Sequence, residues 1–185
     1  MAPNAIVSGN ATIGANTSVL FGAVITADGG PVTIGPDCVI MENAVIRGTP
    51  NQPAQLGRAV LVGPNAHLSG CTVGDEVFLA TGVTVLNGAQ LGDRVEVRIN
   101  GLVHVNTVLD PDTTVPIGWV AVGRPARLYP VEQHDQIWAI QQTLDFAGTV
   151  WGVDRSVPQG ERTRRYAHGL RRYHQGDVVL AEATA

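Results

Sequence analysis

The sequence contains no lysine and few aromatic residues. All twelve basic residues are arginines and the formal net charge is −4. The chain therefore offers no general attraction for nucleic acid or for an anionic membrane surface. Aromatic residues make up only 5% of the chain, whereas glycine, valine and alanine are abundant, which favours a narrow core built from small side chains.

Long apolar runs are also absent, and cysteine is rare. No stretch is long enough to span a bilayer, and the first residues show neither a basic segment nor an apolar segment of a secretion signal. We therefore expect a cytoplasmic protein without a membrane partner. The two cysteines, Cys38 and Cys71, fall at inward positions of the pattern described next, which favours two buried thiols over a disulfide.

What the sequence does contain is a six-residue repeat from Val7 to Val115. Aliphatic residues recur at almost every sixth position, and a small or β-branched residue stands two positions before each. This spacing is neither the period of a helix nor the alternation of a simple strand. A hexad with one bulky and one small inward position is typical of a short strand and a turn. Three such strands form one triangular coil, and stacked coils share a continuous core.

Interruptions of the repeat support the same fold. An aliphatic–glycine pair opens successive groups of three hexads, at Ile13, Ile34, Leu56, Val73 and Leu91. Every extra or missing residue falls between such groups, so the irregular segments stack at one corner of a prism. The pattern predicts an all-β solenoid, a parallel β-helix of about six triangular coils, with one or two C-terminal helices packed alongside.

Three parts are predicted along the chain. Residues 1–118 form the hexapeptide-repeat β-helix, 119–130 a capping segment, and 131–185 a C-terminal helix and an arginine-rich tail. Residues 47–55 are predicted to be a loop because they contain two prolines. Helical spacing runs from Val131 to Leu144, and residues 155–175, which hold six arginines, are either a second helix or a partly ordered tail.

Several stretches resemble the γ-class carbonic anhydrases of the hexapeptide-repeat superfamily. The similarity covers about residues 6–130 and is most specific at the Gly-Cys-Thr-aliphatic-Gly-Asp run within residues 70–75. The other matching stretches are 22–25, 32–35, 82–88 and 122–127. The resemblance implies a left-handed coil and a homotrimer with active sites between subunits. It also implies a zinc or iron ion held by three histidines.

None of the three implied ligand positions holds a histidine. Arg47, Pro64 and Ser69 stand where the resemblance places them. Arginine is a permanent cation, proline has no side-chain donor, and a lone serine is a poor ligand. Without a metal, no water is converted to hydroxide near neutral pH. We therefore predict no cofactor and no zinc-dependent hydration of CO2; zinc or iron is expected only if the metal site has moved.

The repeat places other polar residues on one outer face. His67 and His104 lie on the same face but two coils apart, about 10 Å at ordinary strand spacing, so they cannot share one metal ion within a subunit. Each could still contribute to a relocated site at a subunit interface. His67, Glu42 and Ser69 are the candidate catalytic residues, with His67 as general base.

Arg47 and Asn65 are the candidate residues for binding a small anionic ligand, because a fixed guanidinium suits a carboxylate or a phosphate. Arg47 could instead pair with Glu42 or with an aspartate of a neighbouring subunit. Three functions remain open. The first is a metal-free trimer with a binding or assembly role, the second an enzyme with a rebuilt interfacial pocket, and the third a hexapeptide acyltransferase.

Overall fold

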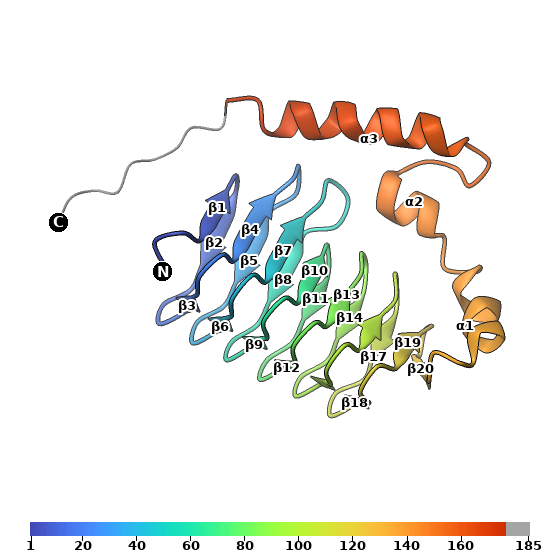
Figure 1. Ribbon diagram of the computed structural model, residues 1–185, viewed down its shortest axis with the longest axis horizontal. Helices are drawn as coiled ribbons and strands as arrows, with labels where there is room; N and C mark the ends of the chain where they lie inside the picture. Colours follow the sequence, from blue (N-terminus) through green and yellow to red (C-terminus); the bar gives the residue numbers. More distant parts are fainter. Residues whose placement is uncertain (177–185) are drawn as a thin grey trace.

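The computed structural model describes residues 1–176, and Figure 1 shows a prism of stacked coils with helices along one side. The coils wind left-handed and number about six, as the hexads and the family resemblance predict. The last nine residues of the predicted 131–185 segment lie outside the described residues. The division at residues 118 and 130 stays a prediction.

Three parallel sheets form the sides of the prism, and each coil contributes one strand to each sheet. The first sheet contains β1 (Ile6–Ser8), β4 (Val24–Ala27), β7 (Val45–Gly48), β10 (His67–Ser69), β13 (Thr84–Val85), β16 (Leu102–Val103), β19 (Val120–Val122) and the antiparallel β20 (Arg127–Tyr129). The second contains β2 (Ala11–Ile13), β5 (Val32–Ile34), β8 (Ala54–Leu56), β11 (Thr72–Val73), β14 (Gln90–Leu91) and β17 (Val108–Leu109). The third contains β3 (Ser18–Val19), β6 (Val39–Ile40), β9 (Leu61–Val62), β12 (Phe78–Leu79), β15 (Glu96–Val97) and β18 (Thr114–Val115).

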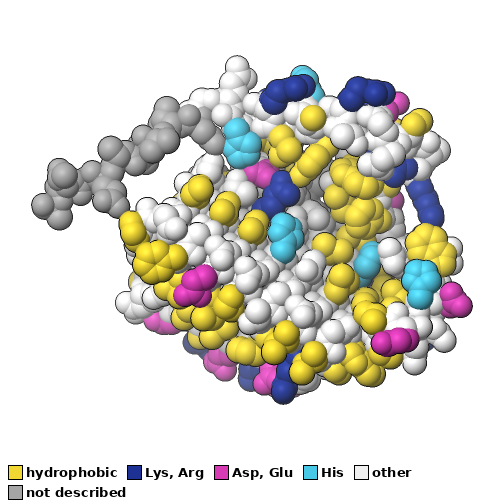
Figure 2. All heavy atoms as spheres, viewed as in Figure 1, with side chains coloured by type: hydrophobic (Ala, Val, Ile, Leu, Met, Phe, Trp, Pro, Cys, Tyr) yellow, Lys and Arg dark blue, Asp and Glu magenta, His cyan; other side chains and the backbone are white. Residues whose placement is uncertain are grey.

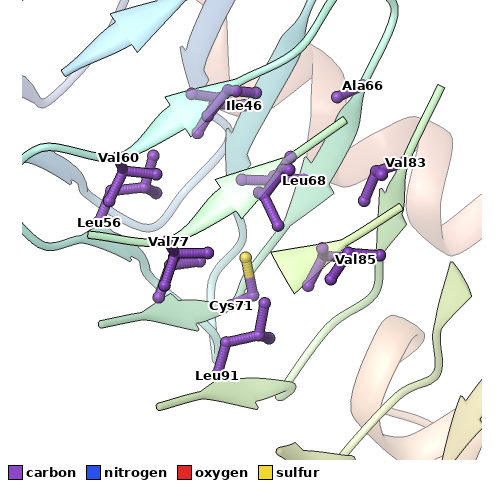
Figure 3. Close-up of a cluster of buried hydrophobic side chains, with 14 of the residues drawn as sticks. Ile46, Leu56, Val60, Ala66, Leu68, Cys71, Val77, Val83, Val85 and Leu91 are labelled. Atoms are coloured by element: carbon purple, nitrogen blue, oxygen red, sulfur yellow. The ribbon is translucent and has the colours of Figure 1, made fainter. Parts of the chain in front are cut away.

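The core consists of the residues that the hexad pattern points inward. Figure 3 shows bulky aliphatics such as Ile46 and Leu68 meeting small residues such as Ala66 and Cys71 inside the prism. The strand register places aliphatic side chains of successive coils next to one another. Leu68, for example, pairs with Ile46 on one side and with Val85 on the other. Both cysteines are buried and free, as predicted, and burial raises the pKa of the Cys71 thiol to about 12.

The loop prediction for residues 47–55 is wrong at both ends. Strand β7 continues through Gly48 and β8 begins at Ala54, because Arg47 and Gly48 pair with Thr26 and Ala27 of the preceding coil. Only residues 49–53, which hold both prolines, leave the ladder. Beyond the last coil, Trp119 packs against the end of the core, as expected for a cap.

The C-terminal segment forms α1 (His134–Gln141), α2 (Phe146–Trp151) and α3 (Gln159–Tyr173). The helix predicted over 131–144 is shorter at both ends. Asp145 then adopts a left-handed conformation and caps α2 by accepting from the Gly148 backbone amide at 3.1 Å. The arginine-rich segment is helical as α3, with Glu161 in its first turn and Arg171 and Arg172 in its last, the favourable order for the helix dipole. Figure 1 shows α3 running back along the prism toward the first coils.

Candidate functional site

The first sheet presents a column of polar side chains on its outer surface. Register places Arg47 between Thr26 and Ser69, and places His67 next to Val45 and Thr84. Because side chains alternate along a strand, the residues on either side of the buried Ile46 and Leu68 point outward. Three of the predicted site residues, Arg47, His67 and Ser69, therefore share one surface.

Arg47 forms an ion pair with Asp28 of the same chain. The Arg47 Nε donates to Asp28 Oδ2 at 2.9 Å and its Nη2 contacts the same oxygen, while Thr26 Oγ1 donates to Oδ1 at 2.6 Å. Within the chain the partner is therefore Asp28 and not Glu42, because strand pairing brings the end of β4 beside β7. The side chains are 24% and 6% exposed for Arg47 and Asp28.

This pairing keeps both groups charged. Burial alone would raise the pKa of Asp28, but hydrogen bonds from Thr26 and Arg47 and the charges of Arg47 and His174 outweigh it, and the pKa is lowered. Burial likewise opposes the charge of Arg47. The hydrogen bonds to Asp28 and Tyr166 outweigh burial and raise its pKa. The guanidinium is thus already neutralised within the chain.

Helix α3 covers this ion pair. Arg47 Nη2 donates to the Tyr166 hydroxyl at 2.7 Å, and His174 Nε2 lies 3.0 Å from Asp28 Oδ1. The Tyr173 ring reaches Gly29, where a Cβ would come within 2.7 Å of the ring and where φ is +89°. Glycine is required there by both the close approach and the left-handed conformation.

A pocket of about 450 Å³ opens between the first sheet and the helices. One wall holds Arg47, His67, Ser69, Leu86 and Asn87 from the sheet and its turns, and the other holds side chains of α2 and α3. Figure 2 shows hydrophobic side chains gathered below these helices, with basic and histidine side chains beside them. At the floor, Asn87 Nδ2 donates to Thr49 Oγ1 at 3.1 Å.

His67 is held neutral in this setting. Burial lowers its pKa, and the charge of Arg47 lowers it further. Neutral imidazole has one donor and one acceptor nitrogen, so His67 can accept a proton or share a hydrogen bond. Its neighbour Ser69 is 6% exposed, and its hydroxyl has no hydrogen-bond partner within residues 1–176.

The remaining predicted residues lie away from the pocket. Glu42 and Asn65 occupy turns between the third and first sheets. There the backbone N–H of Asn65 donates to the backbone carbonyl of Glu42 at 3.0 Å. Asn65 has φ +58°, like Asn43 and Asn100 at equivalent corners, which gives it a conformational role. Pro64 lies in the same turn. The structure does not bring Glu42, Asn65 or Pro64 to the lining of the pocket.

His104 lies on the same sheet as His67 but is covered by α2. Its ring centroid is 6.2 Å from that of Phe146, and burial lowers its pKa. The buried Nδ1 has no hydrogen-bond partner in the part of the chain that the structure describes. Among residues 1–176, no group of three or more histidine, cysteine, aspartate or glutamate side chains is arranged to hold a metal ion.

The hexapeptide repeat gives no sign of the residues that α3 supplies to this site. Tyr166, His174 and Tyr173 contact Arg47, Asp28 and Gly29, but nothing in the repeat points to them. A signal was present, because Tyr166, Leu170 and Tyr173 follow helical spacing and mark the face that packs on the sheet. Within residues 1–176, no helix is both long and apolar enough to cross a bilayer.

Comparison with known proteins identifies the relatives of this chain. No family model matches it. It is 32% identical over 149 residues to γ carbonic anhydrase 1 (mitochondrial) of Arabidopsis thaliana, covering 77% of this chain and 52% of that protein. It is 27% identical over 131 residues to a carbonic anhydrase of Geobacillus kaustophilus, covering 71% and 69%.

Among solved structures, a UDP-N-acetylglucosamine O-acyltransferase of Moraxella catarrhalis covers 93% of this chain and 84% of its own, with 18% identity and a TM-score of 0.48. The chain spans about half the length of the Arabidopsis relatives it matches. The repeat and the left-handed coil are those of a hexapeptide-repeat solenoid, and over about three quarters of its length the chain is similar in sequence to γ carbonic anhydrases.

Proposed function

We propose that this protein is a γ-carbonic-anhydrase-like subunit that does not carry out zinc-dependent CO2 hydration and instead has a binding or assembly role. The observation that carries the proposal is the ion pair of Arg47 with Asp28. Arg47 stands at the position that the family resemblance assigns to the first metal-binding histidine. The Arg47 side chain is engaged in an ion pair within the chain, and a guanidinium paired in this way cannot serve as a metal ligand.

The donor set at the three positions does not fit zinc or iron. A guanidinium carries no free lone pair and repels a cation, Pro64 offers no side-chain atom, and Ser69 alone is a weak ligand. A relocated site based on His67 or His104 gains no support within one subunit, because neither histidine has two further ligands near it among residues 1–176. Metal-bound hydroxide is therefore not part of the proposed function.

The small anionic ligand expected at Arg47 is not favoured either. Asp28 already neutralises the guanidinium, so an anion there would have to displace Asp28 or lie beside its negative charge. An acyltransferase function has no supporting observation in the site. A cytoplasmic location stays a prediction; the Arabidopsis relatives are named as mitochondrial proteins.

The proposal includes a homotrimer, and exposed apolar residues at one corner support self-association. Phe21, Ile99 and Ile117 lie in turns between the third and first sheets and are 57%, 46% and 64% exposed. Ile99 and Ile117 are neighbours in adjacent coils, and exposed apolar side chains that lie together are typical of an interface. Sedimentation should give three times the chain mass for the wild type, and Ile99→Asp should weaken the assembly. Gln90→Asp, on the second sheet, is the matched control and should leave it unchanged.

Two measurements on one preparation test the proposed loss of metal chemistry. Protein purified without a tag or chelator is analysed for zinc and iron, and CO2 hydration is followed by stopped flow with and without added zinc. We expect far less than one metal per subunit and no turnover above buffer. Stoichiometric metal together with zinc-dependent turnover would refute the proposal.

A further inference from the structure

We propose that the pocket between the first sheet and helices α2 and α3 binds a neutral, planar aromatic small molecule, hydrogen-bonded to Ser69 and His67. The inference rests on the proposed binding role and gives it a ligand class. The pocket's volume of about 450 Å³ lies within the range of ordinary small-molecule sites.

Aromatic side chains concentrate around this pocket. The chain has nine phenylalanine, tryptophan and tyrosine residues, and four of them line it, namely Phe146, Trp151, Tyr166 and Tyr173. Phe146 and Trp151 pack edge to face with their centroids 5.2 Å apart. The solvent-exposed fractions of Phe146, Tyr166 and Tyr173 are still 36%, 36% and 38%. The fold thus leaves ring surface uncovered where a flat apolar ligand would cover it.

The opposite wall supplies neutral hydrogen-bonding groups. Ser69 has a hydroxyl without a partner among the described residues, and His67 is held in its neutral form by burial and by Arg47. A hydroxyl and a neutral imidazole can each donate and accept. They lie on the same strand with one residue between them, so both point to the same side of the sheet. A ligand with an amide-like edge satisfies both.

The charged side chains that line the pocket disfavour both anionic and cationic ligands. Arg47 is paired with Asp28, and Arg165, the other basic residue lining the pocket, is paired with Glu161 of its own helix. A carboxylate ligand would meet Asp28, and a cationic ligand would meet the Arg47 guanidinium. Either would lose its hydration without gaining an unpaired counter-ion. A neutral ligand avoids this cost.

Three probes of almost identical shape test the ligand class. Benzamide is neutral, benzoate is anionic and benzamidine is cationic, and all are flat rings with a planar substituent. Binding to the full-length protein is measured by ligand-observed NMR and calorimetry at neutral pH. We expect benzamide to bind at least tenfold more tightly than either ion. No binding of benzamide, or tighter binding of benzoate or benzamidine, would overturn the proposal.

Substitutions then locate the site. Ser69→Phe fills the pocket and should abolish benzamide binding, whereas Thr72→Phe, an exposed position on the second sheet, should leave it unchanged. Ser69→Ala removes only the hydroxyl and should weaken binding two- to tenfold through the lost hydrogen bond. Unchanged affinity in Ser69→Ala and in folded Ser69→Phe would contradict the assignment.

Metal content and CO2 hydration are measured on the same preparation. Zinc-dependent turnover with intact benzamide binding would refute only the proposed function. If the protein is metal-free and inactive and also does not bind benzamide, only this inference is refuted.

Discussion

Arg47 and Asp28 show how a charged pair is tolerated on the face of a solenoid. The carboxylate is nearly covered and accepts from Thr26 as well as Arg47, so its remaining lone pairs are used. Removing one member of such a pair leaves the other without its counter-charge, which costs more than the pair contributes.

Asp28→Asn should therefore lower the free energy of unfolding by about 1–3 kcal/mol. Asp112→Asn is the matched control, because Asp112 pairs with Arg94 at an exposed position, and its effect on the free energy of unfolding should be clearly smaller. Chemical denaturation compares the two variants. Equal losses of unfolding free energy in the two variants would show that burial of the Asp28 pair does not increase its contribution to stability.

His104 presents the opposite case, a buried polar group that is not satisfied. The Nδ1 atom lacks a partner among the described residues, and the ring lies against Phe146. Since an unmet buried nitrogen destabilises the fold, His104→Leu should raise the free energy of unfolding by about 1 kcal/mol. His134→Leu, at an exposed position of α1, should change it by less than about 0.5 kcal/mol. A clear destabilisation by His104→Leu would mean that the imidazole ring makes a stabilising contact in the folded protein.

At the scale of elements, α3 is attached to the solenoid through a few polar contacts. It has no fully buried residue, and Tyr166 and His174 reach the ion pair below. An element with little buried apolar surface opens at low free-energy cost. The helix is therefore the part of the pocket wall that is easiest to displace.

Tyr166→Phe removes the hydrogen bond to Arg47 and keeps the ring. Amide hydrogen exchange across residues 159–173 should accelerate about two- to tenfold, while exchange in the first-sheet strands stays unchanged. Arg164→Lys, on the exposed part of the same helix, is the control and should match the wild type. An unaltered α3 in Tyr166→Phe would show that apolar packing alone holds the helix.

The solenoid could be predicted from the sequence and the docking of the helices could not. Inward positions such as Ile46, Leu68 and Cys71 recur at a fixed spacing. The sequence therefore indicates the same local geometry many times over, once in each hexad. The contact of Tyr166 with Arg47 joins residues 119 positions apart and occurs once. Arg47, His67 and Ser69 could be grouped because register follows from the repeat. The sequence also predicts Glu42 and Asn65 at this site, but they lie at a corner whose distance from the pocket depends on the path of each turn.

For the whole molecule, three titrating groups on the first-sheet face, His67, His104 and Asp28, act in the same direction. His67 and His104 have lowered pKa values in the folded state, chiefly through burial, so the unfolded chain binds more protons below its ordinary histidine pKa of about 6.5. Their contribution to stability is complete above that pH and is lost as the pH falls toward the folded-state values. Asp28, also lowered, contributes fully above about pH 4 and loses its contribution below it.

The free energy of unfolding should therefore be highest near neutral pH, fall in a first step below about pH 6.5, and fall again below about pH 4. Denaturation curves recorded between pH 3 and pH 8 measure both steps. Combining His67→Gln with His104→Leu should flatten the first step and leave the second, whereas Asp28→Asn should reduce the second. If the double histidine variant keeps the first step, the protons responsible bind elsewhere, and the neutral state assigned to His67 in the pocket would lose its support.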